Sequence, residues 1–187
     1  MAAATAALAC GAPRPVAPGP GPETTTGDPS RVWPPDQVYL LEVSGVPAPD
    51  TTLFLHRGER RVVVLRHGPP DNVTFAEVAF APDALGPAAG ESVRVAIRPR
   101  PGVYGVDLET GAPLTAATVT FKYAMHFSAP DAARRQYGSD AAFERVLAIG
   151  RIIPDTGIRF LVSTRPASDN LSAVIPGGGS YAVGAPR

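Results

Sequence analysis

Residues 117–127 read ATVTFKYAMHF, and this stretch decides the fold class. Large apolar side chains occupy every second position, and the positions between them hold threonine, lysine, alanine and histidine. A period of two over the whole stretch places the two sets of side chains on opposite faces of an extended chain, whereas a helix requires a period of 3.6. The stretch therefore predicts a β-strand with one buried face and one solvated face.

Shorter runs of β-branched and aromatic residues, bounded by glycine, proline, aspartate and asparagine, occur on both sides of this stretch. They predict strands at 37–44, 51–57, 60–66, 72–80, 91–98, 145–153, 157–163 and 179–185. One short helix is expected at 130–137, and 140–148 fits either a helix or a strand. Because no helices of 10–15 residues separate the strands, the pattern favours antiparallel pairing. The predicted fold is all-β, an antiparallel β-sandwich of about nine strands.

Turn residues mark the predicted connections between strands. Gly58-Glu59 predicts a tight hairpin between 51–57 and 60–66. Asp155-Thr156-Gly157 predicts a turn before the strand at 157–163, and Gly177-Gly178-Gly179 predicts a tight turn into the last strand.

The first 35 residues have a different composition from the rest. Residues 11–35 contain eight prolines and four glycines, with little to bury. Such a stretch predicts a disordered, Pro/Gly-rich tether. The domain division is therefore a signal-peptide remnant and tether at 1–35, followed by the β-sandwich at 36–187.

Cys10 is the single cysteine and stands where the tether composition begins. Ala-Leu-Ala-Cys at 7–10 resembles the end of a bacterial lipoprotein signal peptide, which implies that Cys10 is lipidated. Leu8 lies one place later than in that family, and the preceding residues lack a basic segment and a full apolar segment. The alternative is an alanine-rich tail with an incidental cysteine. Release of a Cys10→Ala variant from membranes of the native host would separate these readings.

Composition and charge exclude several classes of function. Seventeen basic residues balance seventeen acidic ones, so no overall basic field attracts nucleic acid. One cysteine excludes an internal disulfide framework, and no apolar run approaches the ~20 residues of a membrane span. Lys122 is the only lysine beside sixteen arginines, which indicates codon bias of a GC-rich genome.

Several short motifs in 70–185 have a recognisable order. They are Phe-Ala-Pro-Asp-Ala-Leu at 80–85, the strand ESVRVAIRP, Pro-Gly-Val-Tyr-Gly-Val-Asp-Leu at 101–108, the strand ATVTFKYA, and Gly-Ser-Tyr-Ala-Val at 179–183. This order resembles the ZU-five domain, an all-β module of zonula occludens proteins, netrin receptors and ankyrins, and its bacterial relatives. Gly179 stands where the family has an aromatic residue. The resemblance implies a β-sandwich with a role in interaction or scaffolding more often than catalysis.

One motif offers a rival, catalytic function. Some eukaryotic ZU-five-containing proteins cleave themselves at a His-Phe-Ser tripeptide, and His126-Phe127-Ser128 matches it. In those members, however, the tripeptide lies near the closing strand of the domain, whereas here it ends the long middle strand. The alternative is an aromatic strand end followed by a turn serine. Measuring the intact mass of the purified protein separates the two hypotheses.

Other candidate groups give no catalytic pattern. His56, His67 and His126 lack the spacing of metal ligands, and we expect no metal and no cofactor. The carboxylates Asp83, Glu91, Asp107 and Glu109 are interpreted as solvated groups beside turns and strand ends. A basic stripe of Arg94, Arg98 and Arg100, and the hairpin arginines Arg57, Arg60, Arg61 and Arg66, would either face phosphate or acidic polysaccharide or solubilise an edge strand. Asn72-Val-Thr and Asn170-Leu-Ser fit the N-glycosylation pattern, which matters only in a eukaryotic secretory host.

The sequence thus predicts a non-enzymatic, exported β-sandwich domain with a binding or structural role. Its expected location is the bacterial cell envelope, lipid-anchored or periplasmic, with the cytoplasm as the alternative. The expected partner is a protein or another envelope component, with membrane contact only through a lipid anchor and no nucleic acid. Affinity would come from a sheet face, an edge strand or end loops.

Overall fold

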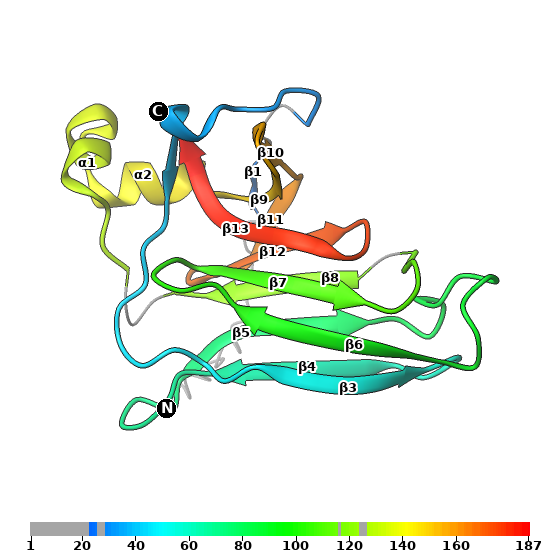
Figure 1. Cartoon of the computed structure of the whole chain (residues 1–187). Helices are drawn as coiled ribbons and strands as arrows, with labels where there is room; N and C mark the ends of the chain where they lie inside the picture. Colours follow the sequence, from blue (N-terminus) through cyan, green and yellow to red (C-terminus); the bar gives the residue numbers. More distant parts are fainter. Residues whose placement is uncertain (1–22, 26–28, 116, 124–126) are drawn as a thin grey trace, which may run out of the picture.

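The fold is an antiparallel β-sandwich, as the period-two pattern predicts (Figure 1). The structure is a computed structural model that describes residues 23–25, 29–115, 117–123 and 127–187. Sheet A contains, in spatial order, β1 (Glu23–Thr25), β11 (Ser163–Ala167), β12 (Asn170–Ile175), β8 (Ala117–Lys122), β5 (Thr74–Phe80) and β4 (Arg61–Arg66). Sheet B contains β10 (Gly157–Phe160), β9 (Ala148–Ile153), β13 (Gly179–Pro186), β7 (Gly105–Thr110), β6 (Ser92–Pro99) and β3 (Thr51–His56), and β2 (Val38–Leu40) also pairs with β13.

The stretch that decides the fold class lies at the centre of sheet A. β8 pairs with β12 on one side and with β5 on the other. Val119, Phe121 and Tyr123 are buried, whereas Thr118, Thr120 and Lys122 on the opposite face are only partly covered, as predicted. The strand ends at Lys122, and residues 124–126 of the predicted strand lie outside the described residues.

The predicted hairpin at Gly58-Glu59 is wrong. β3 pairs with β6 in sheet B, and β4 pairs with β5 in sheet A, so the chain crosses from one sheet to the other at this turn. Gly58 does adopt a positive φ of 77° there. Each of the two strands therefore keeps one edge without a partner strand in the described part of the chain.

Four strands of the described residues are absent from the predicted set, namely β1, β7, β11 and β12. β7 contains Asp107 and Glu109, and β11 contains Pro166, so neither reads as an apolar run. Pairing to neighbours on the sheet, rather than local propensity, makes these segments extended.

Two short helices follow β8. α1 (Asp131–Tyr137) begins after Pro130, as predicted, and Gly138 ends it with a φ of 84°. The segment 140–148, which fits either a helix or a strand, contains the helix α2 (Asp140–Val146). The Ser139 hydroxyl caps this helix by accepting a hydrogen bond from the Ala142 amide at 3.1 Å. Neither helix has the length to span a bilayer, and the described part of the chain holds no other α-helix.

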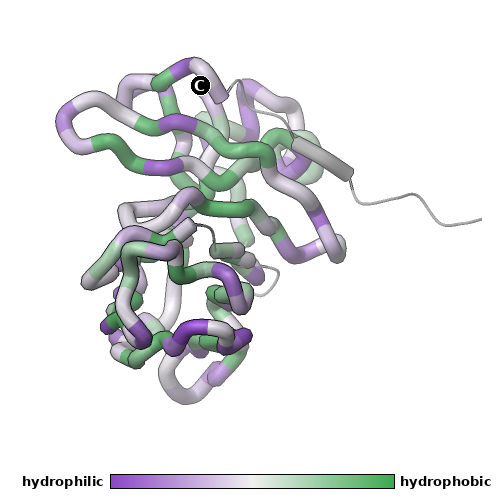
Figure 2. The backbone as a smooth tube through the Cα atoms, turned by 90° about the vertical axis from the view of Figure 1, so that its right-hand side faces the viewer, coloured by the Kyte–Doolittle hydropathy of each residue, from purple (hydrophilic) through white to green (hydrophobic). Residues whose placement is uncertain are grey.

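Aromatic rings form a continuous row through the core. Phe75 stacks on Tyr104 at 5.4 Å between ring centroids, and Tyr104 meets Tyr123 edge-on at 6.4 Å. The row continues through Phe127 to Phe143 on α2. Figure 2 shows hydrophobic segments running through the middle of the molecule and hydrophilic ones at several of the outer turns. The row attaches the helices to the sandwich.

Part of the segment predicted as a tether belongs to the sheets. β1 pairs with β11, and the Trp33 amide and carbonyl exchange hydrogen bonds of 2.8 Å with Ile158 on β10. The side chain of Trp33 packs against a small apolar cluster that includes Ile158 and Phe160. At these positions the chain covers sheet edges rather than forming a tether. Residues 1–22, including Cys10, lie outside the described residues.

The turn at Asp155-Thr156-Gly157 is confirmed as a hairpin between β9 and β10. Asp155 adopts a φ of 58°, a region that aspartate tolerates. The glycines at 177 and 179 have φ values of 130° and 148° where the chain crosses from β12 to β13, which is the predicted tight turn.

Candidate functional site

The histidines do not form a joint site in the described part of the chain. His56 is exposed on β3, whereas His67 is buried at the end of β4, with its ring edge-on to Phe75 at 5.3 Å. The Nδ1 atom of His67 lies 3.3 Å from the Val46 carbonyl oxygen. His126 lies outside the described residues. No group of three or more His, Cys, Asp or Glu side chains among the described residues could hold a metal ion.

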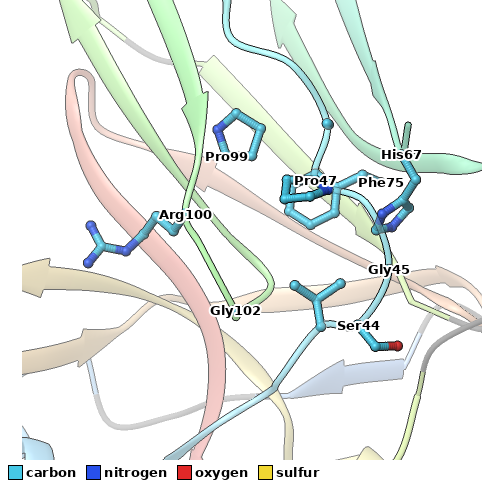
Figure 3. Close-up of a pocket in the computed structure, with 10 residues that line it drawn as sticks. Ser44, Gly45, Pro47, His67, Phe75, Pro99, Arg100 and Gly102 are labelled. Atoms are coloured by element: carbon cyan, nitrogen blue, oxygen red, sulfur yellow. The ribbon is translucent and has the colours of Figure 1, made fainter. Parts of the chain in front are cut away.

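A small pocket lies beside His67 and has a volume of about 40 Å³. His67 and Phe75 line it on one side, and Pro99 and Gly102 line it on the other (Figure 3). Phe75 reaches it through a β-bulge, because Arg66 pairs with Thr74 and Leu65 with Ala76. Since ligand pockets measure roughly 300–1,000 Å³, this one is too small for a cofactor.

Ser128 opens on a second, wider hollow of about 340 Å³. Its lining includes the carboxylates of Glu42 and Asp131, and no histidine or lysine among the described residues. Phe127 is partly buried against Phe143, with the two rings stacked at 6.5 Å. Ser128 therefore shares this hollow with two acidic residues, and self-cleavage at His126-Phe127-Ser128 stays a prediction.

The predicted basic stripe on sheet B is largely neutralised by neighbouring carboxylates. Arg98 is ion-paired with Glu109, and its Nε lies 3.5 Å from Asp50 Oδ2. The hydrogen bond with Glu109 raises the pKa of Arg98. Arg100 donates to Asp107 at 2.6 Å. Arg98 and Arg100 are thus ion-paired, whereas Arg94 is exposed on β6 and is the member of the stripe that stays open to an anion.

Arg57, one of the predicted hairpin arginines, is held by hydrogen bonds within the protein. The Arg57 guanidinium donates to backbone carbonyls of 85–90, which makes it part of the loop rather than of a binding face.

Of the two predicted glycosylation sites, Asn72 is exposed in the loop before β5. Asn170 is partly buried on β12, with its Oδ1 atom buried, so Asn72 is the more exposed of the two.

A polar cluster joins the end of β8 to α2 and β11. The Tyr123 hydroxyl donates to Glu144 Oε1 at 2.9 Å and accepts from Arg165 Nη1 at 2.7 Å. Arg165 also donates to the carbonyls of Glu144 and Leu147 at the end of α2. Burial raises the pKa of Tyr123. The cluster holds the helix against the sheet and contains no nucleophile in a cavity, so we interpret it as structural.

Tyr104 is fully buried like Tyr123, but its hydroxyl has no hydrogen-bond partner in the described part of the chain. We therefore expect Tyr104→Phe to leave the free energy of unfolding at neutral pH nearly unchanged or slightly raised. Tyr123→Phe removes two hydrogen bonds and should lower it by roughly 1–3 kcal/mol. Urea denaturation of the two variants checks this, and equal losses would contradict the assigned partners.

The buried Tyr104 also predicts a response of stability to alkaline pH. Burial raises the pKa of Tyr104 to about 12, whereas tyrosine in the unfolded chain ionises near pH ~10. The unfolded state thus loses its proton first, so stability falls between the two values, by roughly 3 kcal/mol for this group. Tyr104→Phe should lose correspondingly less over that interval in alkaline denaturation curves.

The surface with the clearest binding geometry is the end of the sandwich formed by β3 and β4, which we call the open end. β3 ends sheet B and β4 ends sheet A, and both appear at the bottom of Figure 1. Phe54 on β3 is 61% exposed, and Val62 and Val64 on β4 are 47% and 42% exposed. Apolar side chains beside an unpaired strand edge are the features that strand-adding partners use.

The sequence predicts a hairpin at Gly58-Glu59 and therefore gives no sign that both of its strands end a sheet. In a hairpin, the strands at 51–57 and 60–66 would have paired with each other and covered one edge each. The available signal was the outward valines of β4, which stand at alternate positions with the arginines of 60–66 around them. That pattern predicts a strand, and its arginines fit an edge strand, but the pattern does not show that the strand at 51–57 is not its partner.

Comparisons of the chain with known protein families, with curated proteins and with solved structures found no match. The resemblance to the ZU-five domain therefore stays a prediction.

Proposed function

We propose that this protein is a non-enzymatic binding domain that takes up an extended segment of a partner protein as an additional strand on β4. A strand at a sheet edge presents a row of unpaired backbone N–H and C=O groups, which bind an added strand through main-chain hydrogen bonds. β4 has six residues, enough for a complete ladder. The exposed side chains of Val62 and Val64 supply apolar contact on its outer face.

The observation that carries the proposal is the difference between the two ends of the sandwich. At the end opposite β3 and β4, short segments add to the sheets, because the three-residue β1 pairs with β11 and Trp33 pairs with Ile158 of β10. At the open end, no described segment pairs with the outer edge of β4 or β3. Proteins commonly protect such edges with charged side chains, and the exposed Arg60, Arg61 and Arg66 flank β4, but its centre exposes two valines, which supports a binding role.

The proposed setting is the one expected from the sequence, an exported domain in the bacterial cell envelope, anchored through Cys10 if that residue is lipidated. A tethered domain with an open strand edge could bind a partner near the membrane surface. Strand addition on β4 requires neither a metal nor a cofactor.

A peptide-display library panned on the purified protein tests the proposal. We expect the selected peptides to be rich in β-forming residues, and their affinity to fall at least about tenfold in the double variant Val62→Lys/Val64→Lys, since lysine on an edge disfavours pairing. Fluorescence polarisation of labelled peptides gives the affinities.

Val174→Lys is the matched control. Val174 is 64% exposed on the outer face of the same sheet, but on β12, whose two edges are both paired. The control should bind like the wild type. Failure to select any peptide, or selection of peptides that bind the β4 variant unchanged, would rule out the proposed function.

A further inference from the structure

We infer that the strand that binds β4 carries carboxylates at both ends of an apolar centre, an inference that rests on the proposed function. Three arginines and no carboxylate lie within 60–66. Arg60, Arg61 and Arg66 are all exposed, and they flank the valines on both sides. The edge is therefore apolar in the middle and basic at each end.

The charges on these arginines are weakly compensated within the described chain. Arg61 Nη1 lies 3.3 Å from Glu59 Oε1, with both side chains more than one-third exposed, an arrangement worth little in water. Arg66 donates to a backbone carbonyl, that of Asn72 at 3.4 Å, which leaves its charge unneutralised. Acidic side chains from a partner can therefore pair with both ends of the strand.

Strand geometry places the partner's side chains. Val62, Val64 and Arg66 share the outer face of β4, and Val63 and Leu65 point towards the core. Leu53 and Val63 pack against the core but remain only partly buried at the open end. An added strand would lay apolar residues over Leu53 and Val63 and beside the outer valines, with its acidic residues opposite the arginines.

A second copy of this chain fits the edge poorly. If two β4 strands paired antiparallel about a two-fold axis at Val63, Arg60 of each copy would face Arg66 of the other, on the outer face of the sheet. A two-fold axis at Val64 would instead place Arg66 opposite Val62, a charged side chain against an apolar one. Like charges directly opposite each other destabilise a strand pair. The charge pattern therefore favours a different, acidic partner.

Three synthetic peptides of one design test this inference. The first has glutamates at both ends of a valine-, threonine- and isoleucine-rich centre, the second has glutamines in place of the glutamates, and the third has lysines. We expect the acidic peptide to bind about tenfold tighter than the glutamine peptide at low salt, with the difference shrinking at high salt. The lysine peptide should bind weakest.

Charge reversal on the protein should invert this order. The double variant Arg60→Glu/Arg66→Glu is expected to prefer the lysine peptide. Arg159→Glu is the control, because Arg159 is exposed on β10 at the opposite end of the sandwich, and this variant should behave as the wild type. Equal binding of the acidic and glutamine peptides would overturn the charge inference and leave strand addition standing. Binding of none of the three would count against the proposed function itself. A polyglutamate peptide without an apolar centre that bound as tightly would show a general anion surface and overturn the inference.

Discussion

Phe143→Ala is expected to lower the free energy of unfolding by about 3–5 kcal/mol. The ring is fully buried on α2 and lies between three other rings. It meets Tyr39 edge-on at 6.2 Å, stacks on Phe127 at 6.5 Å and contacts Tyr137 at 5.7 Å. Truncation leaves a cavity where the two helices join the sandwich, so the helices should also become more accessible to protease.

Phe54→Ala is the control for this prediction. Phe54 is a phenylalanine of the same size, but its side chain is 61% exposed on β3. Its truncation should change the unfolding free energy by less than about 0.5 kcal/mol. Guanidinium denaturation followed by circular dichroism measures both. A loss below about 1 kcal/mol for Phe143→Ala would contradict the packing of α2 on the core.

Gly157→Ala is expected to displace the segment around Trp33 and to cost more than about 2 kcal/mol. Gly157 has a φ of 143°, and a Cβ added there would lie 2.0 Å from the Trp33 carbonyl oxygen and 3.2 Å from Pro34 Cα. Both contacts are with backbone, which cannot rotate away. The two hydrogen bonds between Trp33 and Ile158 should therefore break.

The single tryptophan makes this change directly measurable. Trp33 fluorescence should move to longer wavelength in Gly157→Ala as the indole leaves its apolar cluster. Gly90→Ala is the control, since a Cβ at that position meets nothing within 4 Å. An unchanged emission spectrum in Gly157→Ala would show that Trp33 does not sit against β10.

The sequence predicts a strand well where one of its faces is buried and the other is exposed to solvent. β8 and β6 show this alternation, and the structure confirms both with Val93, Val95 and Val119 buried. Strands whose own apolar pattern is short or interrupted are harder to predict, and even β12, where Leu171, Ala173 and Ile175 alternate, is absent from the predicted set. β11, with Pro166 and Arg165, is extended because β1 and β12 lie on its two sides.

Sheet membership was harder to predict than strand position. The turn at Gly58-Glu59 has the composition of a hairpin, but its strands belong to different sheets. Local sequence sets the turn, whereas the partners of β3 and β4 come from β6 and β5, which follow later in the chain. Similarly, Trp33 stands among prolines, and only its pairing with Ile158, far along the chain, reveals that it belongs to the sheet.

Residue-by-residue amide hydrogen exchange, measured by NMR with and without the acidic peptide, tests strand addition on β4 most directly. In an antiparallel sheet, alternate residues of an edge strand bond to its one neighbour and the others face outward. The outward-facing amides of 61–66 should exchange more slowly when the peptide is bound, while the amides of β10 at the opposite end of the sandwich stay unchanged. If the peptide binds and the exchange of every β4 amide is unaltered, the partner is not an added strand on β4, and the proposed function is wrong.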